Sequence, residues 1–216
     1  QKLTDPLESA AQSAAWSGVS GGGEDQDWSP RLPKPDKAMT ERWLEKYPAH
    51  PDLLEALVSY ELVLAENKPG PELAPLLERY SAARPVDPLP HQMLARIYLG
   101  LKPGQSLEGE GIAGAIPHLE YLDAREQSSA TYAAELARQY AALKEWTRAA
   151  AKAERATTVA PFDADYRELA ATVALQHGDY ASALRHITAL TIIEPGREIH
   201  KQRLDAVKAM MKKNPG

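Results

Sequence analysis

Two consecutive stretches near the C-terminal end of the sequence decide the fold. They read ATYAAELARQYAALKEWTRAAAKAERATTVAPFD, residues 130–163, and ADYRELAATVALQHGDYASALRHITALTIIEPGR, residues 164–197. Each has 34 residues, and the two align without gaps. A fixed internal period of this length is typical of repeat proteins, in which one structural unit is copied and stacked.

The aligned positions have the chemistry of two packed helices. Ala137, Ala149 and Pro161 each recur as the same residue type 34 positions later. Small residues let antiparallel helices approach closely, and proline ends a helix because it cannot continue the hydrogen-bond ladder. The segment HGDY, 177–180, predicts a tight turn between helices, with Gly178 free to adopt a positive φ.

This pattern resembles the tetratricopeptide repeat (TPR), most clearly over 130–197. That family places small residues at repeat positions 8, 20 and 27, an aromatic residue at 11 and proline at 32. The second copy departs from it, with Ala174 at position 11 and Leu190 at position 27. In the first copy these positions hold, in chain order, Ala137, Tyr140, Ala149, Ala156 and Pro161.

The resemblance implies an all-α fold, a right-handed superhelix of antiparallel helix hairpins. Extending the register upstream predicts about five hairpins and a C-terminal capping helix in one continuous α-solenoid, because a single hairpin cannot bury its apolar stripe alone. The predicted units are 1–53 (a degenerate N-terminal helix pair with a long Gly/Ser/Pro-rich loop at 18–35), 54–87 (a divergent repeat), 88–129 (a repeat with an eight-residue insertion at about 100–111), 130–163, 164–197 and 198–216 (the capping helix).

Composition excludes several classes of function. The 216 residues include no cysteine, which removes disulfides, thiol nucleophiles and cysteine-ligated metals. The formal net charge is −5, without the concentrated basic face of a nucleic-acid-binding protein. Apolar runs are too short to predict membrane insertion. The compartment is left open.

The segment GEGIAG, 109–114, matches the G-x-G-x-x-G fingerprint of dinucleotide-binding loops. That motif needs a buried strand before it and a helix after it. The preceding LKPGQSLE, 101–108, has the Pro and Gly of a turn instead. We therefore interpret GEGIAG as the end of the insertion, leading into the second helix of a repeat, and predict no bound cofactor.

Other chemical motifs are also missing from the sequence. The six histidines include no H-x-x-x-H or H-E-x-x-H pair, and no G-x-S-x-G is present. The acidic segments EDQD, 24–27, and EGE, 108–110, lack the ligand spacing of an EF-hand. We predict no catalytic residue and no metal site, although a metal site assembled from distant helices stays open.

The resemblance implies a binding groove lined by the first helix of each hairpin, through repeat positions 2, 5, 9, 12 and 13. Arg96 and Arg138 share position 9 of adjacent copies; together they could hold a carboxylate, or simply be solvated. The clamp by which some members bind acidic chaperone tails needs Lys at position 5 and Asn at position 9, and is not supported here. The insertion is a second candidate contact. The predicted groove residues are Gln92, Arg96, Leu99, Thr131, Ala134, Arg138, Ala141, Glu168 and Thr172, and the remaining lining positions hold Leu89, Ala142, Asp165, Leu175 and Gln176.

Three functions follow as hypotheses. The first is a non-catalytic protein–protein interaction scaffold that binds a peptide or partner segment. The second is an accessory C-terminal domain of a larger bacterial enzyme, for example a peptidase, whose catalytic domain precedes Gln1; the absence of an initiator Met leads us to expect a piece of a longer protein. The third, a dinucleotide-dependent enzyme, depends only on GEGIAG.

Overall fold

The computed structural model describes residues 36–66, 68–100 and 111–213. Within these ranges the chain forms ten α-helices and one short 3-10 helix (Pro71–Leu73), and no strand. The α-helices are α2 (Lys37–Lys46), α3 (Pro51–Leu64), α4 (Ala74–Ala83), α5 (Pro88–Leu99), α6 (Gly111–Arg125), α7 (Thr131–Ala142), α8 (Trp146–Val159), α9 (Ala164–His177), α10 (Tyr180–Ile193) and α11 (Glu198–Lys213).

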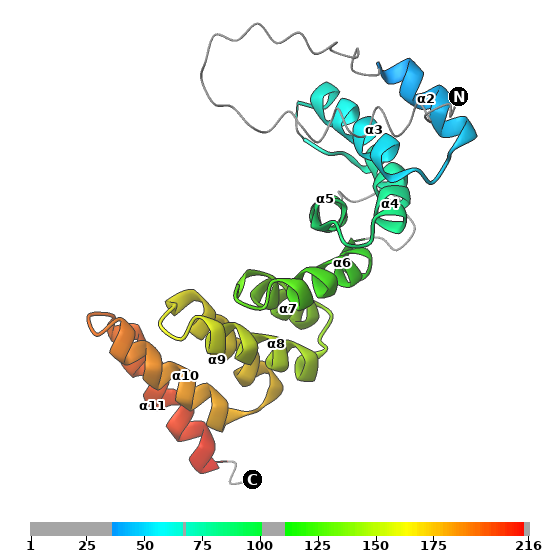
Figure 1. Cartoon of the computed structure of the whole chain (residues 1–216). Helices are drawn as coiled ribbons and strands as arrows, with labels where there is room; N and C mark the ends of the chain where they lie inside the picture. The colour runs from blue at the N-terminus through cyan, green and yellow to red at the C-terminus, as the bar shows by residue number, and fades with distance from the viewer. Residues whose placement is uncertain (1–35, 67, 101–110, 214–216) are drawn as a thin grey trace, which may run out of the picture.

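The helices stack in chain order. Each described helix packs on the next one along the chain, and α7 also packs directly on α9. Figure 1 shows the result, an elongated row with α2 and α11 at opposite ends. The predicted all-α solenoid of consecutive helix pairs is confirmed. The helix predicted near Asp5 and the loop predicted at 18–35 lie outside the described residues.

Aspartate side chains cap several helix starts. The carboxylate of Asp36 accepts a hydrogen bond from the backbone N of Met39 at 2.7 Å, and that of Asp179 from Ser182 at 3.0 Å. Each bond satisfies one of the backbone N–H groups that a helix leaves unpaired at its first turn. Between α9 and α10, Gly178 adopts φ 82°, as the HGDY turn predicts.

Small residues meet where the helices approach most closely. Ala137 of α7, Ala153 of α8 and Ala170 of α9 form one buried cluster. The larger Leu136 and Tyr140 on α7 are fully buried and fill the space toward the preceding helices. Close packing at alanines therefore joins consecutive hairpins, as ridge-into-groove packing requires.

The helices upstream begin at points set by local signals. Helix α3 starts at Pro51, before the boundary at 54 suggested by the repeat register, because His50 and Pro51 form its N-cap and first turn. Helix α6 starts at Gly111, within GEGIAG, with φ 61°. It packs on α5 and α7 as the second helix of a pair. Residues 101–110, which hold most of the predicted insertion, lie outside the described residues.

Candidate binding groove

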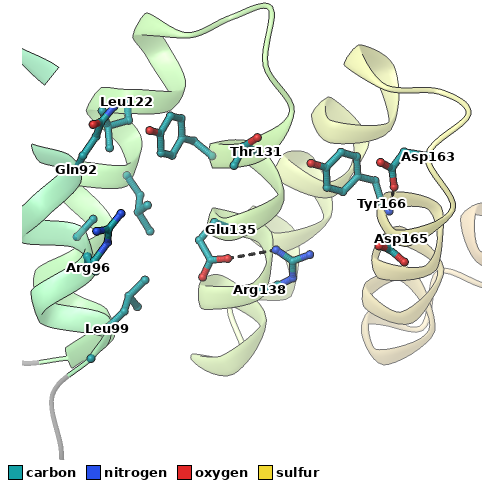
Figure 2. Close-up of a pocket in the computed structure, with 14 residues that line it drawn as sticks. Gln92, Arg96, Leu99, Leu122, Thr131, Glu135, Arg138, Asp163, Asp165 and Tyr166 are labelled. Carbon is teal, nitrogen blue, oxygen red and sulfur yellow. Dashed lines mark hydrogen bonds and ion pairs between the residues drawn. The ribbon is translucent and has the colours of Figure 1, made fainter. Parts of the chain in front are cut away.

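A hollow of about 690 Å³ lies between the first helices of three successive hairpins, α5, α7 and α9. We call it the groove. Figure 2 shows its labelled side chains in three groups: those of α5, with Leu122 of α6, on one side, those of α9 and its N-cap Asp163 on the other, and the α7 residues between them. Its lining consists of Gln92, Ala95, Arg96, Leu99, Gly100, Leu119, Leu122, Thr131, Tyr132, Glu135, Arg138, Asp163, Asp165 and Tyr166.

The repeat brings residues of equal register to the same face. Arg96 and Arg138, both at repeat position 9, line the groove. So do Tyr132 and Tyr166, which occupy position 3 of adjacent copies, 34 residues apart. Because successive first helices present equivalent faces, one sequence position becomes a row of similar side chains along the groove.

Tyr132 of α7 lies in the lining of the groove. Its ring packs against the core, and the side chain of Gln92 on α5 lies near its hydroxyl. Burial raises the pKa of the Tyr132 phenol, and the nearby carboxylate of Glu126 raises it further. The phenol is therefore neutral at physiological pH and can exchange hydrogen bonds with a bound chain.

An ion pair lies in the middle of the groove. Nη1 of Arg138 is 3.2 Å from Oε2 of Glu135, one turn earlier on α7, and the two side chains are 47% and 30% exposed. The dashed line between them in Figure 2 marks this ion pair. Its two opposite charges partly neutralise each other. An exposed pair of this kind contributes little to stability, so it can rearrange around a ligand.

The other charged groups of the groove have no ion partner among the described residues. Within 4.0 Å, no opposite charge of the described residues pairs with Arg96, Asp163 or Asp165. Asp163 instead caps α9, accepting from the backbone N of Tyr166 at 3.1 Å. The groove thus carries two arginines and three carboxylates.

Most of the groove residues expected on α5 do lie there. Gln92, Arg96 and Leu99 line the hollow, together with Thr131 and Arg138 of α7 and Asp165 of α9. Leu89, Ala142, Leu175 and Gln176 do not line it.

Four other expected residues lie elsewhere. Ala134 is fully buried in a cluster with Ala130, Ala133 and Ala156, so it does not line the hollow. Ala141 is partly buried against the core, and Thr172 is exposed outside the hollow. Glu168 also lies outside it and accepts a hydrogen bond from Arg203 of α11. Ala134 is covered because α9 packs on α7 there, with Tyr166 and Leu169 against its cluster.

Sequence reasoning missed seven side chains that line the groove, among them Ala95 of α5 and Asp163, the N-cap residue of α9. Tyr132, Glu135 and Tyr166 fall outside the five repeat positions that the resemblance suggests. The 34-residue spacing of the two tyrosines was a signal that could have found them. Leu119 and Leu122 belong to the second helix α6 and form part of the floor.

The described residues show no arrangement for metal chemistry or membrane insertion. No group of three or more His, Asp or Glu side chains in the described ranges could hold a metal ion. Among the same residues, no helix combines the length and apolar character needed to span a bilayer.

The stacked hairpins and the groove across their first helices define a TPR-type fold. No known family model matches the chain, and no curated protein matches it significantly. Among solved structures, the MamA protein superimposes with a TM-score of 0.52 at 12% identity, covering 74% of this chain and 81% of its own. YrrB, described as a TPR protein with an unusual peptide-binding site, does so with a TM-score of 0.53 at 15% identity, covering 77% and 80%. At these identities the likeness establishes the fold.

Proposed function

We propose that this chain is a non-catalytic protein–protein interaction scaffold that binds an extended peptide or partner segment in the groove. The observation that carries the proposal is an open hollow across three first helices, lined by side chains at matching repeat positions. YrrB, which has a similar fold, is described as having a peptide-binding site, and this supports the same use here.

The chemistry of the lining favours a protein segment. Tyr132 and Tyr166 offer rigid aromatic surfaces with a hydroxyl at the tip, a combination enriched at protein interfaces. Three carboxylates against two arginines would repel the phosphate backbone of a nucleic acid. The apolar Leu99, Leu119 and Leu122 provide contact area between the charged groups.

The proposal is tested by capture of peptides from a displayed library of random heptapeptides. Arg96→Ala combined with Arg138→Ala should weaken binding of the selected peptides at least about tenfold, since each lost charged hydrogen bond costs about 1.5–3 kcal/mol. The melting temperature should barely change, because Arg138 makes only an exposed ion pair.

The matched control is Arg42→Ala combined with Arg197→Ala. It removes the same charge from exposed arginines outside the groove, and Arg197 has an i,i+3 partner, Glu194, as Arg138 has Glu135. Unchanged capture by the groove variant, or equal loss in the control, would remove the groove assignment. The hypothesis of an accessory enzyme domain concerns sequence beyond this chain and stays a prediction, which the gene sequence before Gln1 would test.

A further inference from the structure

The charges of the groove are divided between its two sides. Arg96 is the only charged side chain that α5 contributes to the lining. The charged side chains from α9 and its N-cap are both acidic, Asp165 and Asp163. Between the two sides, the pair of Glu135 and Arg138 on α7 cancels much of its own charge. Figure 2 shows this order, with Arg96 and the two aspartates on opposite sides of the pair.

We infer that the segment recognised by the groove is dipolar, with an Asp or Glu side chain bound at Arg96 and a Lys or Arg side chain bound at Asp163 and Asp165. The inference rests on the proposed function, because it names the chemistry of the partner that occupies the same groove. Complementary charges at both ends also set the register of a bound chain and reject segments of uniform charge.

The three groups are available to a partner. Arg96, Asp163 and Asp165 are all exposed, and no ion pair between described residues engages them. Glu168, the next acidic residue on α9, contrasts with them because Arg203 already binds it. A partner would therefore add ion pairs at the two ends of the groove without breaking existing ones.

The guanidinium of Arg96 suits a carboxylate in particular. Its planar fork of donors matches the two oxygens of a carboxylate, and such bidentate pairs are stronger than single contacts. The neighbouring Gln92 carries no charge, so Arg96 is the charged donor on this side of the groove.

The helix spacing sets the separation of the two charges in the partner. Helices in direct contact lie about 8–10 Å apart. Helix α9 packs on α7, and α5 lies beyond α7 across the hollow, so α5 and α9 are separated by on the order of 20 Å. An extended chain advances about 3.3 Å per residue. The acidic and basic residues of the bound segment should therefore be separated by roughly five to six positions, with the intervening side chains on Leu99 and the two tyrosines.

The test uses heptapeptides selected from the same random library, synthesised with an acetylated N-terminus and an amidated C-terminus so that only side chains carry charge. The selected peptides should be enriched in an acidic and a basic residue five or six positions apart. Arg96→Glu should weaken the binding of these peptides at least about tenfold. A new selection on this variant should enrich basic residues at the position that was acidic. Arg42→Glu, a charge reversal outside the groove, should leave binding unchanged.

The acidic side is tested by Asp163→Ser combined with Asp165→Asn. Serine keeps a helix cap, so α9 stays folded while both charges are removed, and preference for the basic residue should disappear. Enriched peptides without the charge pattern, or with a pattern that neither variant alters, would overturn the dipolar inference alone. A library that yields no enriched peptide would overturn this inference and the proposed function together.

Discussion

Asp123 of α6 accepts a hydrogen bond from Nε of Arg155 on α8, at 2.9 Å, although the Asp123 side chain is only 4% exposed. The same carboxylate lies 2.6 Å from Nζ of Lys152. Both bases come from the second helix of the following hairpin. The buried aspartate thus connects two successive repeats on the side away from the first helices.

The same relationship occurs at two other junctions. Glu154 of α8 binds Arg185 and His186 of α10, with 2.8 Å between its Oε1 and Nε2 of His186. Glu78 of α4 lies 3.4 Å from Nε2 of His118 on α6. In each case the earlier second helix supplies the carboxylate and the later one the base, so polar contacts join the hairpins that alanine packing also joins.

We predict that Asp123→Ala lowers the free energy of unfolding by about 3 kcal/mol, because it leaves two bases without their buried partner. Breaking a buried ion pair costs about 3–5 kcal/mol. We expect the lower value because Lys152 and Arg155 are 26% and 29% exposed and can be hydrated once Asp123 is removed. Urea unfolding followed by circular dichroism measures the effect. Lys201→Ala, which breaks the exposed pair with Glu198, is the control and should cost less than about 0.5 kcal/mol. Equal losses would contradict the prediction.

Ala137→Leu should destabilise the protein by about 1–3 kcal/mol. Ala137 is fully buried against Ala153 and Ala170, so a larger side chain must push α8 or α9 away. Ala142→Leu on the same helix changes an exposed residue and is the matched control. The two midpoints of urea unfolding should differ clearly, and coinciding midpoints would show that close approach at Ala137 is unimportant.

Gly178→Ala should cost about 1 kcal/mol, because a residue with a β-carbon is strained at φ 82°. No atom lies within 4 Å of the added β-carbon, so backbone conformation alone produces the loss. At Gly196 the same substitution also meets open space, and φ there is outside the positive region. Gly196→Ala should therefore leave the melting temperature unchanged, and a matching loss there would refute the explanation.

Stability should decrease as the pH falls from about 7 toward 5. Burial lowers the pKa of His91, His118 and His186 in the folded chain, and for His91 the charge of His118 lowers it further. Below the ordinary histidine pKa of about 6.5, the unfolded chain binds protons that the folded chain does not. The free energy of unfolding therefore decreases as the pH is lowered.

Thermal unfolding at several pH values checks this pH dependence. His186→Gln should reduce the change in melting temperature between pH 7 and 5, since one buried histidine no longer titrates. His177→Gln, at an exposed position, should keep the change as it is in the original protein. A melting temperature that is constant over this range would contradict the prediction.

Much of the fold could be predicted because its causes are local. Alanines and prolines recurring every 34 residues predicted the hairpins of 130–197, since helix packing depends on small residues and helix ends on proline. The positive φ of Gly178 was likewise predictable from HGDY. These features depend on residues close together in the chain.

The groove was predictable only in part. Arg96 and Arg138 share a repeat position and line the same hollow. Gln92 and Ala134 also share a position, yet Gln92 lines the groove and Ala134 is fully buried. Nothing in the register distinguishes the two.

Thus the 34-residue periodicity was sufficient to predict paired helices, and the family resemblance that it carries implied how the pairs stack. The spacing between hairpins decided which faces stay open: α7 and α9 pack directly and bury Ala134, whereas an open hollow remains across the exposed faces of α5, α7 and α9. That spacing depends on contacts between residues about 30 positions apart, such as Asp123 with Arg155 and Glu168 with Arg203. Such contacts form only when the hairpins assemble, and a repeat position carries no information about them.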